Sequence, residues 1–136
     1  MKQGNGRGRG VSTSSRKLDH LRICAGGGVE AGFSGFSDVR LVHAALPECS
    51  LPEIDTEARF LGHRLASPLF IAAMTGGHRD ALPVNRNLAA AAERFGIGMG
   101  VGSQRAALED PDLEDSFTVV REAAPTAFLC ANLGVV

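Results

Sequence analysis

The stretch that decides the fold is Ser67-Pro68-Leu69-Phe70-Ile71-Ala72-Ala73-Met74-Thr75-Gly76-Gly77. An uncharged apolar run, residues 69–74, lies between Pro68 and a pair of glycines. Such a run is typical of a strand that is buried on both faces of a parallel sheet, rather than of a half-exposed strand with alternating polarity. We therefore predict a buried strand here, followed by a turn at Gly76-Gly77.

The same pattern repeats further along the chain. It predicts a helix over residues 83–95, a strand over 98–103, a helix that begins at Asp110-Pro111, and a strand over 127–132. Strands that alternate with helices indicate an α/β fold with a parallel sheet. Each predicted strand ends in a small polar residue, in order Thr75, Ser103 and Asn132. In a parallel sheet these ends share one edge, where α/β folds bind ligands.

Less regular segments precede this pattern. Residues 1–15 are rich in Gly, Ser and basic residues and predict a flexible tail. Residues 16–23 have the spacing of a helical turn, whereas residues 36–48 mix polar and apolar positions too irregularly to predict a strand. Residues 54–65 predict a hairpin that turns at Gly62. In a barrel, such a hairpin would cap the amino-terminal mouth.

Composition excludes several classes of function. The chain has 136 residues, with 14 basic and 15 acidic ones, and this balance indicates neither a nucleic-acid nor a membrane partner. No run is long enough to span a membrane, and the basic start lacks the apolar region of a signal peptide. Cys24, Cys49 and Cys130 are widely spaced, which predicts reduced thiols of a cytoplasmic protein. His43 and His63 lack the spacing of metal ligands.

Two groups of polar residues are candidates for ligand binding. The adjacent cations Arg16 and Lys17, with His20, would attract an anionic ligand such as a diphosphate, although a solvated helix start carries the same charges. The glycines of residues 98–103 do not fit a dinucleotide-binding loop, because no helix opens directly on them. We expect a narrow strand over which a flat ring could lie. At its tip, hydrogen-bond donors to a phosphorylated ligand follow one another, namely Ser103, Gln104 and Arg105.

Five motifs carry a resemblance to a known family. In chain order they are Arg16-Lys17-x-Asp19-His20, Asp38-Val39-Arg40-Leu41-Val42-His43-x-Ala45-Leu46-Pro47-Glu48, Ala73-Met74-Thr75-Gly76-Gly77, Gly100-Val101-Gly102-Ser103-Gln104-Arg105-Ala106-Ala107-Leu108 and Ala131-Asn132-Leu133-Gly134. Together they resemble type 2 isopentenyl-diphosphate isomerase, the FMN-dependent enzyme of isoprenoid biosynthesis. The resemblance covers nearly the whole chain after the tail.

The resemblance implies a (β/α)8 TIM barrel with FMN at its carboxyl-terminal mouth. Such barrels take roughly 250 residues, so residues 16–136 would hold the amino-terminal arm, the capping hairpin and about the first three βα units. The implied reaction converts isopentenyl diphosphate to dimethylallyl diphosphate. It uses reduced FMN, with NADPH as the reductant and Mg²⁺ for the diphosphate, and the full-length family members are expected to be homo-oligomers.

The resemblance also assigns residues to the site. Those that would line the flavin are Ala73, Met74, Thr75, Ser103 and Asn132. Those that would hold the substrate diphosphate are Arg16, Lys17, His20, Ser103, Gln104 and Arg105. The family's His-x-Asn-x-x-Gln-Glu segment, with its catalytic amide and Mg²⁺-binding acid, would lie beyond Val136. The catalytic residues are therefore unknown, no metal ligand is expected in this chain, and the chain alone is expected to be inactive.

Two alternatives stay open. One is another FMN-dependent barrel, such as a 2-hydroxy-acid oxidase, which would share the hairpin and the first strand. The other is a non-catalytic truncated remnant. The Arg16-Lys17 arm and the Ser103-Gln104-Arg105 tip favour a diphosphate ligand over a carboxylate.

Overall fold

The structure, a computed structural model, describes residues 12–134 and has a mixed α/β fold. Its helices and strands are α1 (Thr13–Gly26), β1 (Ala58–Phe60), β2 (His63–Leu65), β3 (Phe70–Ile71), α2 (Ala81–Phe95), β4 (Gly98–Ser103), α3 (Arg105–Glu109), α4 (Asp115–Ala123) and β5 (Leu129–Asn132). Short 3-10 turns lie at Phe36–Asp38, Leu51–Glu53 and Pro111–Leu113.

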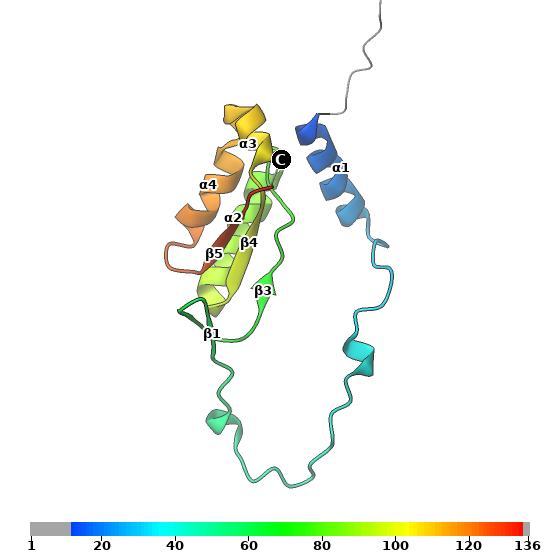
Figure 1. Ribbon diagram of the computed structural model, residues 1–136, viewed down its shortest axis with the longest axis vertical. Helices are drawn as coiled ribbons and strands as arrows, with labels where there is room; N and C mark the ends of the chain where they lie inside the picture. The colour runs from blue at the N-terminus through cyan, green and yellow to red at the C-terminus, as the bar shows by residue number, and fades with distance from the viewer. Residues whose placement is uncertain (1–11, 135–136) are drawn as a thin grey trace, which may run out of the picture.

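The centre of the fold is a three-stranded parallel sheet in the order β3-β4-β5 (Figure 1). This confirms the predicted alternation of strands and helices. β4 has the predicted bounds, α2 begins two residues before the predicted Pro83, and β5 begins two residues after the predicted start at Ala127. Ser103 pairs with Asn132, and the Gly102 amide donates to the Thr75 carbonyl at 2.9 Å. The three predicted strand ends therefore lie at one edge of the sheet.

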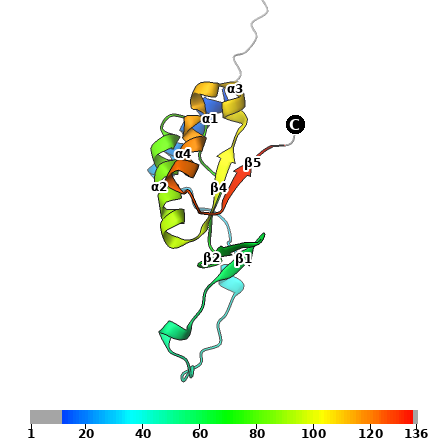
Figure 2. The same cartoon turned by 90° about the vertical axis from the view of Figure 1, so that its left-hand side faces the viewer.

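Helices α2 and α4 cover the same face of this sheet (Figure 2). Alternate residues of β4, Met99 and Val101, point into the core beneath them, where Val119 and Val120 of α4 are also buried. The small alanines of α2 let the two helices approach closely. α2 ends at Gly96, which adopts the left-handed conformation (φ 60°) that glycine adopts without strain.

The prediction that residues 69–74 form a strand buried on both faces is wrong. The strand is limited to Phe70–Ile71, and the side chains of Phe70 and Met74 are 43% and 63% exposed. The reason lies in the neighbours, because β3 is an edge strand and the helices cover only one face of the sheet. Ile71, which points to the helix side, packs against the core.

The prediction of room for a flat ring over β4 is also wrong. The glycines of β4 are buried against the chain's own residues 70–75. A Cβ added at Gly100 would lie 2.9 Å from the Ala73 Cβ atom. One added at Gly98 would overlap the Phe70 ring, and one at Gly102 would overlap the Thr75 carbonyl. The glycines therefore serve the close approach of two backbone segments.

The second predicted helix begins later than its sequence signals indicate. The Asp110 carboxylate accepts a hydrogen bond from the Asp112 amide at 3.1 Å, and Pro111 follows it as predicted for a helix start. These signals start the 3-10 turn Pro111–Leu113, and α4 follows from Asp115. The short helix α3, directly after β4, was not predicted.

The predicted hairpin is confirmed. β1 and β2 pair antiparallel and are joined at Leu61-Gly62, where both residues have positive φ angles (47° and 82°). The Phe60 ring packs edge-on against Phe70 and Phe128, with centroids 5.9 and 5.4 Å apart. Because Phe128 directly precedes β5, the hairpin lies at the amino-terminal end of the sheet (Figure 2).

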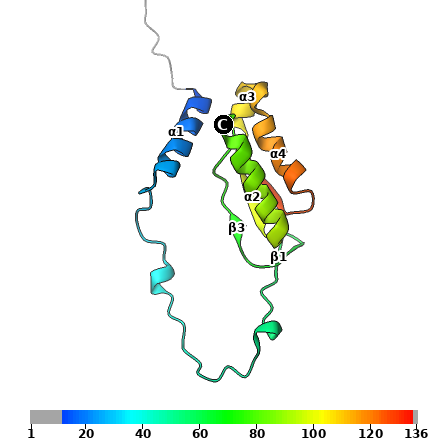
Figure 3. The same ribbon diagram turned by 180° about the vertical axis from the view of Figure 1, so that it is seen from behind.

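A long exposed segment, residues 27–57, connects α1 to this hairpin and loops away from the sheet (Figures 1 and 3). Every residue in it is exposed. Its regular structure is limited to two 3-10 turns, so residues 36–48 contain no strand. Residues 1–11 of the predicted tail lie outside the described residues, and α1 already begins at Thr13. None of the helices described is both long and apolar enough to cross a membrane.

Candidate functional site

A pocket of about 240 Å³ lies where α1 meets the carboxyl-terminal edge of the sheet. Its lining residues are Thr13, Arg16, Lys17, His20, Ser103 and Arg105. All of the predicted substrate residues except Gln104 are therefore together in one place. They come from two segments far apart in the sequence, α1 and the β4–α3 junction, which lie at the same end of the molecule (Figure 1).

Helix α1 brings its three basic residues to the pocket by its spacing. Arg16 and His20 are four residues apart, with Lys17 between them, so they share one side of the helix. The Ser12 side chain caps the helix by accepting from the Ser15 amide at 3.2 Å. No residue of α1 is buried, so packing against an apolar core does not hold this helix in place.

The pocket carries an uncompensated positive charge. Its lining contains three cationic side chains and a histidine but no acid. In residues 12–134 the ion pairs are Arg64 with Glu57 and His78 with Asp80, so the pocket cations have no acidic partner there. Partial burial, and secondarily the charge of Arg16, lower the pKa of Lys17 below its ordinary value. A bound anion would offset both effects.

The β4–α3 junction fixes the other side of the pocket. The Gln104 amide donates to the Asn132 carbonyl at 3.1 Å, which ties the tip of β4 to β5. The Gln104 side chain turns away. It donates to the Gly102 carbonyl at 3.3 Å and lines a separate hollow beside α4. Contact between Gln104 and the substrate stays a prediction, and it would require this side chain to leave Gly102.

The residues predicted to line a flavin lie beside this pocket. Ala73, Met74 and Asn132 are exposed at the sheet edge. With Ser103 they offer polar and apolar groups at this edge, and their contact with a flavin stays a prediction. Thr75 differs, because its hydroxyl points inward and donates to the Asn85 carbonyl oxygen Oδ1.

Two buried polar residues at this edge were missed by sequence reasoning. Asn85 of α2 is fully buried and Ser116 of α4 is 2% exposed. A signal for Asn85 exists, because it occupies an inward position of α2 at a four-residue spacing from Ala81 and Ala89. An amide in such an apolar stripe needs buried partners.

The expected absence of a metal site stays a prediction. Over residues 12–134, no three His, Cys, Asp or Glu side chains gather closely enough to hold a metal ion. Cys24, Cys49 and Cys130 are exposed, free thiols.

Comparison with known proteins places this arrangement in a family. Residues 20–115 match the family described as FMN-dependent dehydrogenase. The chain belongs to that family. This membership agrees with the position of Met74, Ser103 and Asn132 at the carboxyl-terminal edge of a parallel sheet, where α/β folds bind cofactors.

Individual proteins are closely similar to the chain in sequence. The chain is 68% identical over 124 residues to the isopentenyl-diphosphate delta-isomerase of Methanoregula boonei, covering 91% of this chain and 34% of that protein. It is 58% identical to the enzyme of the same name from Archaeoglobus fulgidus, covering 92% and 36%. For Methanothermobacter thermautotrophicus the identity is 49%, covering 89% and 35%. The resemblance carried by the five motifs is thus confirmed, and the chain spans about a third of the length of these relatives.

Proposed function

We propose that this chain supplies the diphosphate-binding part of an FMN-dependent isopentenyl-diphosphate isomerase. The observation that carries the proposal is the pocket in which Arg16, Lys17 and Arg105 gather around Ser103 without an acidic partner. The similarity to relatives that bear this name supports the same substrate.

The chemistry of the substrate explains why the charges gather here. An uncharged alkene offers few polar contacts, so the free energy of binding must come from the remote diphosphate. Arg16 and Arg105 can each donate two parallel hydrogen bonds to phosphate oxygens, while Lys17 acts as a compact charge. The Ser103 hydroxyl is a further donor. These residues bind and orient the substrate, and its double bond would then lie beside the exposed Met74 and Asn132.

The parallel sheet described here would be the first part of a (β/α)8 barrel, with the cofactor at its carboxyl-terminal mouth. When bound there, reduced FMN supplies electron density that stabilises cationic character on an alkene, and a ring nitrogen able to carry a proton. Ala73, Met74, Ser103 and Asn132 would hold one edge of the ring. Thr75 would contribute its backbone, because its hydroxyl is engaged with Asn85.

Several further features of the whole enzyme belong to the proposal. NADPH would keep the flavin reduced, and Mg²⁺ would accompany the diphosphate on a carboxylate that is not among the residues described. The complete enzyme would be a homo-oligomer. The free thiols Cys24, Cys49 and Cys130 are consistent with a cytoplasmic, reducing environment.

A second candidate function is oxidation of a 2-hydroxy acid, because the matched family is named for a dehydrogenase. A carboxylate substrate carries a single negative charge, which one arginine is able to pair. The number of cations around this pocket, and the names of the relatives, favour the diphosphate.

A chimera provides the test. Residues 12–134 replace the matching segment of the Methanoregula boonei relative, and the purified chimera is assayed with reduced FMN, Mg²⁺ and isopentenyl diphosphate. We expect dimethylallyl diphosphate to form, and the 136-residue chain alone to give no turnover. A chimera that binds FMN and oxidises a 2-hydroxy acid, but does not bind isopentenyl diphosphate, would overturn the proposal.

A further inference from the structure

A buried hydrogen-bond network lies beneath the loop that follows β3. Asn85 is at its centre. Its amide nitrogen Nδ2 donates to the Ser116 carbonyl at 2.7 Å and to the Thr75 carbonyl at 3.5 Å. Its Oδ1 atom accepts from the Thr75 hydroxyl. The side chain therefore joins the loop after β3 to both core helices.

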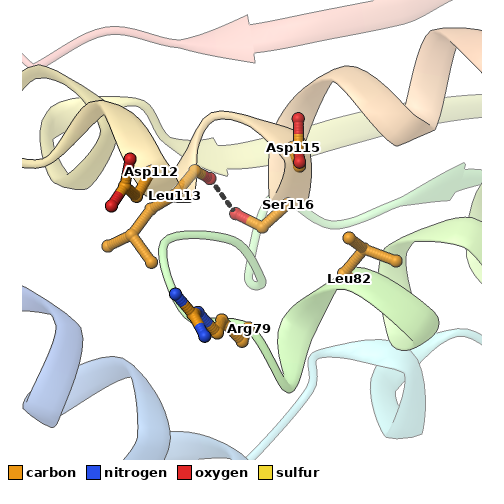
Figure 4. A pocket seen from close by; sticks show the side chains of 6 residues that line it. All are labelled: Arg79, Leu82, Asp112, Leu113, Asp115 and Ser116. Atoms are coloured by element: carbon orange, nitrogen blue, oxygen red, sulfur yellow. Dashed lines mark hydrogen bonds between the residues drawn. The ribbon is translucent and has the colours of Figure 1, made fainter.

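Ser116 holds the next part of the same loop. Its hydroxyl accepts from the Gly77 amide at 2.9 Å and donates to the Leu113 carbonyl at 2.7 Å. Figure 4 shows this hydroxyl directed from the first turn of α4 toward Leu113. Because the Ser116 hydroxyl both donates and accepts a hydrogen bond, these two bonds determine its orientation.

The loop itself is tightly enclosed. Gly76 and Gly77 are buried and have positive φ angles of 134° and 79°. A Cβ at Gly76 would overlap the Phe117 ring, and one at Gly77 would overlap the Ala106 side chain. Such a loop needs polar side chains from neighbouring helices to satisfy its buried backbone groups.

We propose that Asn85 and Ser116 are positioning residues that set the backbone of residues 74–77 for the ligand at the sheet edge. Asn85 is fully buried and Ser116 is 2% exposed, and neither residue lines the anion pocket at the sheet edge. The Thr75 carbonyl also accepts from the Gly102 amide, so the network fixes the loop relative to the tip of β4, next to Ser103. In this arrangement the Thr75 hydroxyl belongs to the network and not to the ligand-contacting surface. The ligand part of this inference rests on the proposed function.

Hydrogen exchange tests the network without any ligand. In the chimera, Ser116→Ala and Asn85→Ala should speed exchange in peptides that cover residues 75–77, and leave β4 protected. The matched controls are Thr118→Ala on α4 and Asn87→Ala on α2, whose side chains are exposed. Equal acceleration in every peptide, or none at residues 75–77, would overturn the inference, because either result would mean that the two residues do not act on this loop.

Flavin binding tests the consequence of the network. We expect the Kd for FMN, measured by fluorescence quenching, to rise about tenfold in Ser116→Ala and Asn85→Ala, since each leaves buried polar groups unpaired. Ser116→Thr, which keeps the hydroxyl, should restore the affinity. An unchanged Kd in both alanine variants would overturn the positioning role. If the unsubstituted chimera fails to bind FMN, the proposed function fails, and the exchange experiment still decides whether the network sets the loop.

A double-mutant cycle decides the role of Thr75. If its hydroxyl acts through Asn85, the losses of FMN affinity in Thr75→Val and Asn85→Ala will not add in the double variant. Additive losses would place the hydroxyl on the ligand and contradict the inference.

Discussion

The two sides of the anion pocket belong to very different parts of the molecule. In residues 12–57, which include α1, no side chain is buried, whereas residues 58–134 contain the entire described core. Arg16, Lys17 and His20 come from the first part, and Ser103 and Arg105 from the second. Apolar burial therefore positions only half of the pocket. The α1 half of the pocket carries two adjacent positive charges, Arg16 and Lys17, which repel each other. A bound anion would offset this repulsion.

Stability should depend almost entirely on the second part. Phe117→Ala removes a buried ring from beneath Gly76 and Gly77, and we expect a loss of about 3–5 kcal/mol in the free energy of unfolding. The contrasting variant is Leu41→Ala, whose side chain is 92% exposed, with an expected change within about 0.5 kcal/mol. Urea unfolding of the chimera measures both. Similar losses of unfolding free energy in Phe117→Ala and Leu41→Ala would contradict the view that residues 58–134 carry most of the stability.

Ligand affinity should depend on both parts equally. Removing one charge-assisted partner of the diphosphate, in Arg105→Ala or Arg16→Ala, should weaken isopentenyl diphosphate binding by about 1.5–3 kcal/mol, or roughly 10- to 150-fold in Kd. Isothermal titration calorimetry of the chimera provides the measurement. Arg22→Ala is the control on α1, because Arg22 does not line the pocket. A loss in Arg105→Ala without one in Arg16→Ala would mean that α1 takes no part in binding.

The pH dependence of diphosphate affinity tests the contribution of Lys17 on α1. Burial and Arg16 lower the pKa of Lys17, and only the protonated amine attracts the diphosphate. Affinity should therefore fall as pH rises through this lowered pKa, so the decline should start below the ordinary lysine pKa of about 10.4. We expect a decline of up to about tenfold between pH 7 and 10. In Lys17→Arg the decline in affinity should disappear, because arginine stays charged over this pH range. An equal decline in Lys17→Arg would mean that a group other than Lys17 causes it.

Within residues 58–134, we expect a smaller effect, on the pH dependence of stability, from Glu93. Its carboxylate accepts from the Thr126 hydroxyl and from the amides of Thr126 and Ala127, at 3.0 and 2.7 Å, and the hydroxyl contributes most to lowering the pKa of Glu93. A carboxyl group with a lowered folded pKa stabilises the fold fully above its unfolded value, about 4.3, and loses this contribution as pH falls through the folded value.

Glu93→Gln should accordingly lower the Tm by a few degrees at pH 7, and the difference should shrink as pH falls below the unfolded value of about 4.3. Differential scanning calorimetry over this range measures it. Glu122→Gln is a matched exposed control that should leave the Tm unchanged at every pH. A Glu93→Gln difference that widens in acid would contradict the assignment.

Local patterns were sufficient for much of the fold. The strand at residues 98–103, the hairpin at Gly62 and the helix end at Gly96 follow from periodicity and from glycine at turns, which depend on neighbours in sequence. The grouping of Arg16 with Ser103 followed from a resemblance, because no local signal indicates where α1 docks.

What the sequence did not reveal depends on distant contacts. The exposure of Phe70 is set by what covers the sheet, and the β4 glycines are explained only by the return of residues 70–75 over them. The Gln104 side chain donates to the Gly102 carbonyl, and no local sequence signal indicates this orientation. The position of Asn85 in the apolar stripe of α2 indicates a buried amide, but its partners, Thr75 and Ser116, are distant in sequence and only the structure identifies them.

The exposed segment of residues 27–57 acts as a tether, and its length sets the effective concentration of α1 at the sheet edge. The entropy of closing such a loop changes slowly with length, by only about 0.6 kcal/mol for each doubling. Insertions or deletions in this segment would therefore alter assembly of the pocket very little, as long as the tether still reaches from Gly27 to the hairpin.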